Sequence, residues 1–144
     1  TPLNDSFVDF DLIGQVDPET FKVKRLSFYA ELIWEARKKR AMATIKDARR
    51  EMDWVVVRNR VGTQRMVNKE KMGRALDNLA KRIGFRVAPG FNERVIFREF
   101  FPRGLTLLDR AVLTDFSLSH VAARNELRAL IAGLNLPGGV EMPA

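Results

Sequence analysis

Asn59 and Arg60 follow an unbroken run of bulky apolar residues at positions 54–57. Such a run is typical of a strand that is covered on both faces in a parallel α/β sheet. Ligands of these sheets bind beyond the carboxyl ends of the strands. The amide of Asn59 can donate and accept hydrogen bonds, and the Arg60 guanidinium can pair with an anion. We therefore predict a ligand site at the end of this strand, while an Asn-Arg turn without a ligand would show the same pattern.

Basic side chains form a second set of candidate functional residues. On a helix predicted over residues 64–83, and on the next one over 93–101, helical spacing groups six of them: Lys71, Arg74, Lys81, Arg82, Arg94 and Arg98. Clusters without Asn or Gln between the bases fit contacts to phosphates better than readout of bases. The pattern predicts nonspecific, salt-sensitive DNA binding. Solvated helix faces explain it equally well from composition alone.

Other catalytic motifs are missing from the sequence. None of the nine glycines precedes a lysine, so there is no Gly-Lys-[Ser/Thr] phosphate loop, and no dinucleotide fingerprint occurs. The spacing of Asp5, Asp9 and Asp11 could suggest a metal site. Asp9 and Asp11 are two residues apart and would face different directions on a helix, however, which makes shared ligation improbable. The chain has no cysteine, and its one histidine, His120, is best interpreted as structural.

Composition points to one folded domain within 144 residues, of which 46% are hydrophobic. No apolar run approaches the ~18 residues of a membrane helix, so we predict a cytoplasmic protein without membrane contacts. The net charge is +7, and the bases concentrate in residues 37–50 and 58–86. That asymmetry favours an anionic partner. Because the chain begins without a leading element, we interpret it as part of a longer one.

The elements that must position these residues alternate between helix and strand. We predict a helix capped by Ser6 that runs to about Gln15, a ribbon to Lys24, strands at 54–58 and 85–88, and a flexible tail at 137–144. Further helices are predicted at 27–50, at 64–83 with Gly84 as its C-cap, at 93–101, and at 117–134 with Ser117 as its N-cap. In the helix at 64–83, helical spacing places Met72, Leu76, Leu79 and Ile83 on one apolar face. This order predicts an α/β fold, a partial doubly wound sheet flanked by helices, over residues 1–136. With perhaps the end of a third strand at 1–3 the sheet is small, so we expect further strands upstream.

Several stretches resemble the MipZ family, division-plane positioning ATPases of the ParA/MinD group of deviant P-loop ATPases. They are TPLNDSFVDFD (1–11), DWVVVRNR (53–60), LAKRIGFR (79–86), RVIFRE (94–99), FPRGLTLLD (101–109) and AARNELRAL (122–130). The resemblance covers nearly the whole chain. It implies the C-terminal half of a P-loop NTPase-like domain.

The resemblance also implies an activity and partners. Proteins of this family are ATP- and Mg²⁺-dependent switches that sandwich ATP on dimerising. They bind nonspecific DNA and the partition protein ParB, inhibit FtsZ polymerisation away from midcell, and associate with the nucleoid and cell pole. By resemblance, Asn59 would contact adenine, with Arg60 beside it and the loop of Pro89, Gly90 and Phe91 near the base. The DNA-facing residues would include Lys71, Arg74, Arg94 and Arg98.

The phosphate loop, signature lysine, switch regions and Mg²⁺-ordering strand of the family would all precede residue 1. We therefore predict no ATP turnover by these 144 residues alone. Two alternatives remain open. One is a freestanding basic module that binds nucleic acid without a nucleotide, and the other is an α/β remnant whose basic faces are merely solvated.

Overall fold

A computed structural model describes residues 1–43, 52–62, 66–109 and 118–136. Within these ranges the elements follow in the order β1 (Pro2–Asn4), α1 (Phe7–Phe10), β2 (Gly14–Val16), β3 (Val23–Leu26), α2 (Phe28–Ala43), β4 (Val55–Asn59), α3 (Met66–Ile83), β5 (Arg86–Ala88), α4 (Val95–Phe100), the 3-10 turn η1 (Phe101–Arg103) and α5 (Leu118–Gly133). None of the described helices is long and apolar enough to cross a membrane.

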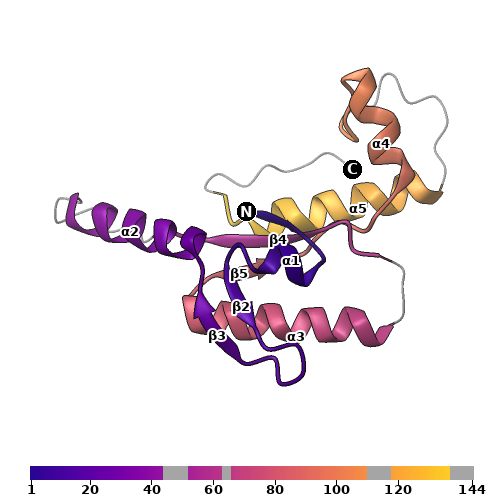
Figure 1. The fold of residues 1–144 in the computed structure, drawn as a ribbon. Coiled ribbons are helices and arrows are strands. Elements are labelled where there is room, and N and C mark those ends of the chain that lie inside the picture. Colours follow the sequence, from indigo (N-terminus) through magenta and orange to yellow (C-terminus); the bar gives the residue numbers. More distant parts are fainter. Residues whose placement is uncertain (44–51, 63–65, 110–117, 137–144) are drawn as a thin grey trace.

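Three strands form a parallel sheet in the order β1-β4-β5. Asn4 is in register with Asn59, and Val57 with Ala88. Figure 1 shows α3 on one side of this sheet and α5 on the other, while β2 and β3 form a separate antiparallel hairpin. The α/β class, with helices flanking a partial sheet, is confirmed, and the strand expected at residues 1–3 is β1.

The main core lies between the sheet and α3. Val56 of β4 is fully buried, and it packs with Leu76 and Leu79 of α3 and with Phe10 and Ile13 from the N-terminal segment. These α3 residues recur at helical spacing, so one face of the helix is apolar, as the sequence predicts. A smaller cluster joins Ile96 and Phe100 of α4 to Leu107 and to Ala123 of α5.

The first helix is much shorter than predicted. Ser6 caps it as expected, because its hydroxyl accepts a hydrogen bond from the Asp9 amide at 3.1 Å. The helix ends at Phe10 instead of Gln15, and Gly14 begins a strand. A Cβ on Gly14 would come within 2.8 Å of the Leu79 side chain and 3.1 Å of the Arg25 carbonyl oxygen. Tertiary packing against α3 and β3 therefore overrides the helical tendency here.

Other boundaries shift by a few residues. Asn59 is the last residue of β4, and Gly84 closes α3 with φ +83°, as its predicted C-cap role requires. The helix predicted over 93–101 is α4 followed by η1. Four predicted features lie outside the described residues: the second part of the helix at 27–50, the start of the helix at 64–83, the Ser117 cap, and the tail at 137–144.

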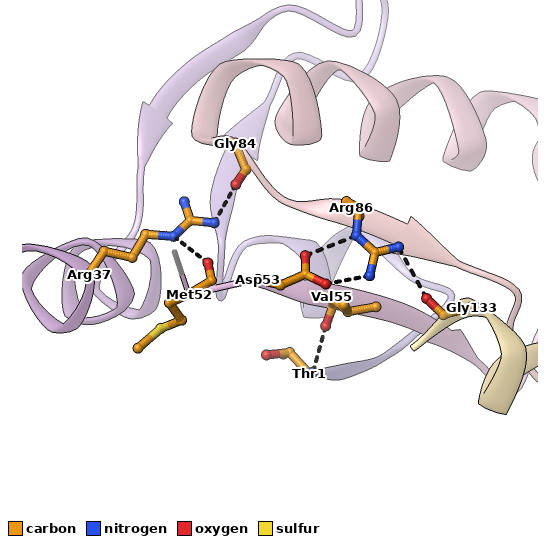
Figure 2. Close-up of polar contacts among 8 residues, drawn as sticks. All are labelled: Thr1, Arg37, Met52, Asp53, Val55, Gly84, Arg86 and Gly133. Atoms are coloured by element: carbon orange, nitrogen blue, oxygen red, sulfur yellow. Dashed lines mark hydrogen bonds and ion pairs between the residues drawn. The ribbon is translucent and has the colours of Figure 1, made fainter. Parts of the chain in front are cut away.

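Two arginines tie flanking helices to the sheet, as Figure 2 shows. Arg37 of α2 donates to the carbonyl oxygens of Met52 (3.3 Å) and Gly84 (2.6 Å). Arg86 of β5 pairs with Asp53 and donates to the Gly133 carbonyl oxygen at the end of α5 (3.1 Å). These contacts satisfy backbone carbonyls at helix and strand ends, which would otherwise lack partners.

Candidate functional site

The carboxyl edge of the sheet brings polar side chains together, as the strand order requires. Asn4 ends β1 and Asn59 ends β4, and the Asn59 Nδ2 donates to the Asn4 Oδ1 at 3.3 Å. The Asn59 carbonyl oxygen accepts from the Asp5 amide at 3.0 Å. The side chain of Asn59 is thus held by β1 and its backbone by the residue that follows β1. This interaction leaves one Nδ2 hydrogen and the Oδ1 atom of Asn59 for a ligand.

A groove of about 980 Å³ opens beside Asn59. Its walls come from the loop after β5, from α4 and η1, and from Leu127 of α5. Its lining includes four aromatic side chains, Phe91, Phe97, Phe100 and Phe101, together with leucines and several polar residues. An apolar cleft with a few convergent polar groups is the usual form of a small-molecule site.

The loop after β5 is fixed against β4 by its backbone. The Phe91 amide donates to the Arg58 carbonyl oxygen at 2.9 Å, and the Val61 amide donates to the Phe91 carbonyl oxygen at 2.9 Å. A Cβ on Gly90 would lie 2.0 Å from the Arg58 carbonyl oxygen. The Phe91 ring meets the Phe97 ring edge to face, with 5.6 Å between centroids. Phe91 is therefore rigidly placed in the groove that Asn59 borders, whereas Pro89 is exposed outside the groove lining.

Arg60 adopts a left-handed backbone conformation, with φ +53°, directly after β4. Its guanidinium donates to a Glu93 carboxylate oxygen at 3.1 Å, and Arg98 donates to the same oxygen at 2.5 Å. The hydrogen bond from Arg60 lowers the pKa of Glu93, and Arg98 adds to this effect. Two predicted site residues, Arg60 and Arg98, thus meet on one carboxylate at the rim of the groove.

Glu126 of α5 forms the most enclosed polar cluster of the groove wall. Arg94 binds it through both Nε and Nη2, the latter at 2.6 Å, and the Asn92 Nδ2 donates to it at 2.5 Å. Exposure of the two charged side chains is 22% for Arg94 and 15% for Glu126. Burial raises the pKa of Glu126, but the hydrogen bonds from Arg94 and Asn92 outweigh it, so the net pKa is lowered. Glu126 therefore stays ionised and fastens α5 to the loop before α4.

Asp5 and Arg58, the neighbours of Asn4 and Asn59 in sequence, form a second enclosed pair. The Arg58 Nε donates to an Asp5 carboxylate oxygen at 2.6 Å, and the side chains are 10% (Asp5) and 16% (Arg58) exposed. Arg58 also donates to the Lys69 carbonyl oxygen of α3 at 3.4 Å. This ion pair connects the carboxyl ends of β1 and β4, next to Asn59.

The six predicted DNA contacts do not form one surface. Four of the six, all exposed, belong to α3: Lys71, Arg74, Lys81 and Arg82. Within the described residues the structure records no ion pair for them, although the Arg74 guanidinium lies over the Phe21 ring at 5.6 Å. Arg94 and Arg98 belong to the α4 region, on the other side of the sheet in Figure 1, and both are ion-paired. The charge of α3 is consequently more available to an anionic partner.

Acidic side chains near the groove, within the residues that the structure describes, are engaged in ion pairs. No group of three or more metal-ligating side chains occurs among the described residues. Near the groove, Asp5 is bound to Arg58, and Glu93 is bound to Arg60 and Arg98. His120 packs against Phe100 with ring centroids 5.9 Å apart, in agreement with a structural role.

The sequence model of the family described as ATPase MipZ matches residues 1–138. The chain belongs to the MipZ ATPase family. Membership gives it an ATPase-family role in cell division, and it agrees with the partial P-loop NTPase-like sheet described above. No curated protein matches the chain significantly.

Sequence reasoning missed several contacts that shape this candidate site. Asn4, Asp5, Asn92, Glu93 and Glu126 are all in direct contact with predicted site residues or with the backbone that carries them. Asp5 and Arg58 are 53 positions apart, and Arg94 and Glu126 are 32 apart. No local pattern could have paired them.

Proposed function

We propose that the groove at the carboxyl edge of this sheet binds the adenine of ATP, and that α3 presents the DNA-facing surface of a division-positioning switch. Such a switch would act in the cytoplasm, at the nucleoid and cell pole, through ParB and FtsZ. The observation that carries the adenine assignment is the Asn59 amide, held by Asn4 beside an aromatic groove. Family membership supports the nucleotide and the division role.

The chemistry of the groove suits a purine. An asparagine amide can donate to N7 and accept from the N6 amino group of adenine in a bidentate pair. An aromatic ring such as Phe91 offers a stacking surface to any base. Hydrolysis would take place at the ATP phosphates, whose charge Mg²⁺ would neutralise. A Gly-Lys-[Ser/Thr] loop usually holds these phosphates, and residues 1–144 contain no such loop. We therefore propose that this chain contributes base recognition and no hydrolysis of its own.

Replacing Asn59 by alanine tests the adenine assignment. Adenosine should shift the amide resonances of Asn59, Phe91 and their neighbours in the 144-residue chain, and uridine should do so far less. Asn59→Ala should weaken adenosine binding about tenfold or more, as loss of a bidentate contact worth ~1–3 kcal/mol requires. Asn59→Asp, which removes the amide donor at constant shape, should weaken it similarly.

The matched control is Asn125→Ala, at an exposed position of α5 outside the groove lining. It should leave adenosine affinity unchanged. Equal affinities of wild type and Asn59→Ala, or resonance shifts confined to another surface, would refute the assignment.

DNA binding by α3 is tested by charge reversal. In the 144-residue chain, Lys71→Glu with Arg74→Glu should weaken binding to a random-sequence duplex. It should also make the plot of log binding constant against log salt concentration less steep by about 2, since each lost phosphate contact removes about 0.9 from the magnitude of the slope. Arg98→Glu with Arg103→Glu makes the same charge change near α4 and should reduce the slope less.

This measurement also separates the alternatives. If the chain binds DNA strongly without nucleotide and does not bind adenosine, a freestanding basic module is favoured. A slope that neither double variant changes would show that both basic surfaces are only solvated.

A further inference from the structure

Side-chain contacts fasten the β2–β3 hairpin to α3, the helix that carries the proposed DNA-facing surface. Near the tip of the hairpin, the Asn78 Nδ2 donates to the Phe21 carbonyl oxygen at 2.8 Å. The Arg74 guanidinium lies over the Phe21 ring, 5.6 Å from its centroid. At the base of the hairpin, Leu26 lines the same hollow as Arg82. The hairpin therefore runs along the second half of α3 (Figure 1).

The tip of the hairpin is held in a specific backbone conformation. Phe21 is left-handed, with φ +57°, which is unusual for a bulky residue and persists only where its surroundings hold it. Its amide donates to the Asp17 carbonyl oxygen at 2.8 Å, and the Asp17 amide donates to the Lys22 carbonyl oxygen at 2.9 Å. Because Lys22 directly follows Phe21, its backbone is fixed close to α3.

Two bases of the hairpin have charges available to an anion. Residues 14–26 contain the exposed bases Lys22, Lys24 and Arg25 and the acids Asp17 and Glu19. Lys24 pairs with Asp17 at 3.0 Å. Hydrogen bonds from the Thr20 amide and from Lys24 hold the pKa of Asp17 well below its ordinary range, so this acid is engaged within the hairpin. For Lys22 and Arg25, no ion pair is recorded with any residue that the structure describes.

The bases of α3 favour the side that meets the hairpin. Asn78 marks this side, since it bonds the hairpin backbone. At 100° per residue, three of the four exposed bases fall within about 40° of Asn78 around the helix: Lys71, Arg74 and Arg82. The exposed acids Glu70 and Asp77 are turned about 80–100° away from it. The positive charge of α3 is therefore concentrated beside Lys22 and Arg25.

We propose that the β2–β3 hairpin is part of the phosphate-binding surface, in which Lys22 and Arg25 form a second row of DNA contacts beside α3 and Phe21 positions Arg74. This inference rests on the proposed binding of DNA by α3. Lys22 and Arg25 are about 10 Å apart along an extended chain. Lys71 and Arg82 are about 16 Å apart along the helix. Two rows of similar length can follow one stretch of duplex, and contacts to phosphates alone carry no sequence preference.

The double variant Lys22→Gln with Arg25→Gln tests the second row in the 144-residue chain. It should weaken binding to a random-sequence duplex about tenfold or more at roughly 0.1 M salt. The plot of log binding constant against log salt concentration should become less steep by about 2, because two phosphate contacts are lost. Lys38→Gln with Lys39→Gln is the matched control, since it removes the same charge from exposed positions of α2 and should leave the slope unchanged.

Phe21→Leu tests the positioning of Arg74. The change keeps an apolar side chain and removes the ring under the guanidinium. It should weaken duplex binding about threefold, as loss of an exposed cation–π contact requires. In a chain that already carries Arg74→Gln, Phe21→Leu should have no further effect on binding. Fully additive effects would show that Phe21 does not act through Arg74.

Titration with the duplex, followed by amide resonances, separates this inference from the proposal on which it rests. Signals of residues 21–25 should shift together with those of residues 71–82, and signals of residues 38–42 in α2 should not. If Lys71→Glu with Arg74→Glu weakens binding while Lys22→Gln with Arg25→Gln behaves like the control, the hairpin is not part of the surface and α3 remains its only established element. If neither double variant changes binding, the DNA-facing role of α3 and the inference drawn from it are both wrong.

Discussion

Gly90→Ala should lower the free energy of unfolding by about 3 kcal/mol, through overpacking and loss of a buried hydrogen bond. A Cβ there would stand 2.0 Å from the Arg58 carbonyl oxygen and 2.9 Å from its carbonyl carbon. Neither atom can move without separating the loop from β4. That separation would break the hydrogen bond from the Phe91 amide to the Arg58 carbonyl oxygen.

Urea unfolding followed by circular dichroism measures this effect. The matched control is Gly73→Ala in α3, where a Cβ would meet only the Arg58 guanidinium at an ordinary 3.5 Å. Alanine is favoured over glycine in a helix by roughly 0.5–1 kcal/mol, so the control should be neutral or stabilising. A Gly90→Ala protein as stable as wild type would show that the loop is not held at this distance.

Gly90→Ala should also affect the groove. Phe91 follows the substituted residue; its backbone amide is bonded to the Arg58 carbonyl oxygen, and its ring packs against the Phe97 ring. Displacement of the loop should therefore weaken adenosine binding even in the fraction of molecules that remains folded. Gly90 would then support the site through the backbone, and not through contact with the base.

Asp5→Asn should cost about 3 kcal/mol of unfolding free energy, the low end of the range for breaking an enclosed ion pair. The change keeps the shape of the side chain but leaves the Arg58 charge, which is 16% exposed, without its carboxylate. Arg58 connects β1 to β4 and reaches the Lys69 carbonyl oxygen of α3. Its displacement should loosen all three elements together.

A double-mutant cycle separates the pair from its surroundings. Arg58→Met removes the charge at similar volume, and the double variant Asp5→Asn with Arg58→Met should be more stable than the sum of the single effects predicts. Glu35→Gln breaks the exposed pair with Lys38 and should change stability little. Additive effects of Asp5→Asn and Arg58→Met would show that the two side chains do not interact.

The sequence alone determined the features that depend on local patterns. The apolar run at 54–57 predicts β4, and the spacing of Met72, Leu76 and Leu79 predicts the buried face of α3. Ser6 and Gly84 act as helix caps in the structure, as their residue types indicate. These predictions succeed because hydrophobic periodicity and capping act over only a few residues.

Tertiary structure alone decided what depends on residues far apart in the chain. Gly14 lies where Leu79 and Arg25 leave no room for a Cβ, and Gly90 lies where the backbone of Arg58 leaves none. The same holds for charge: the sequence groups Arg94 with the α3 bases, whereas the fold pairs it with Glu126. Steric contact and Coulomb attraction act at close range in space, so only the fold shows which backbone needs a glycine and which cations remain available to a partner.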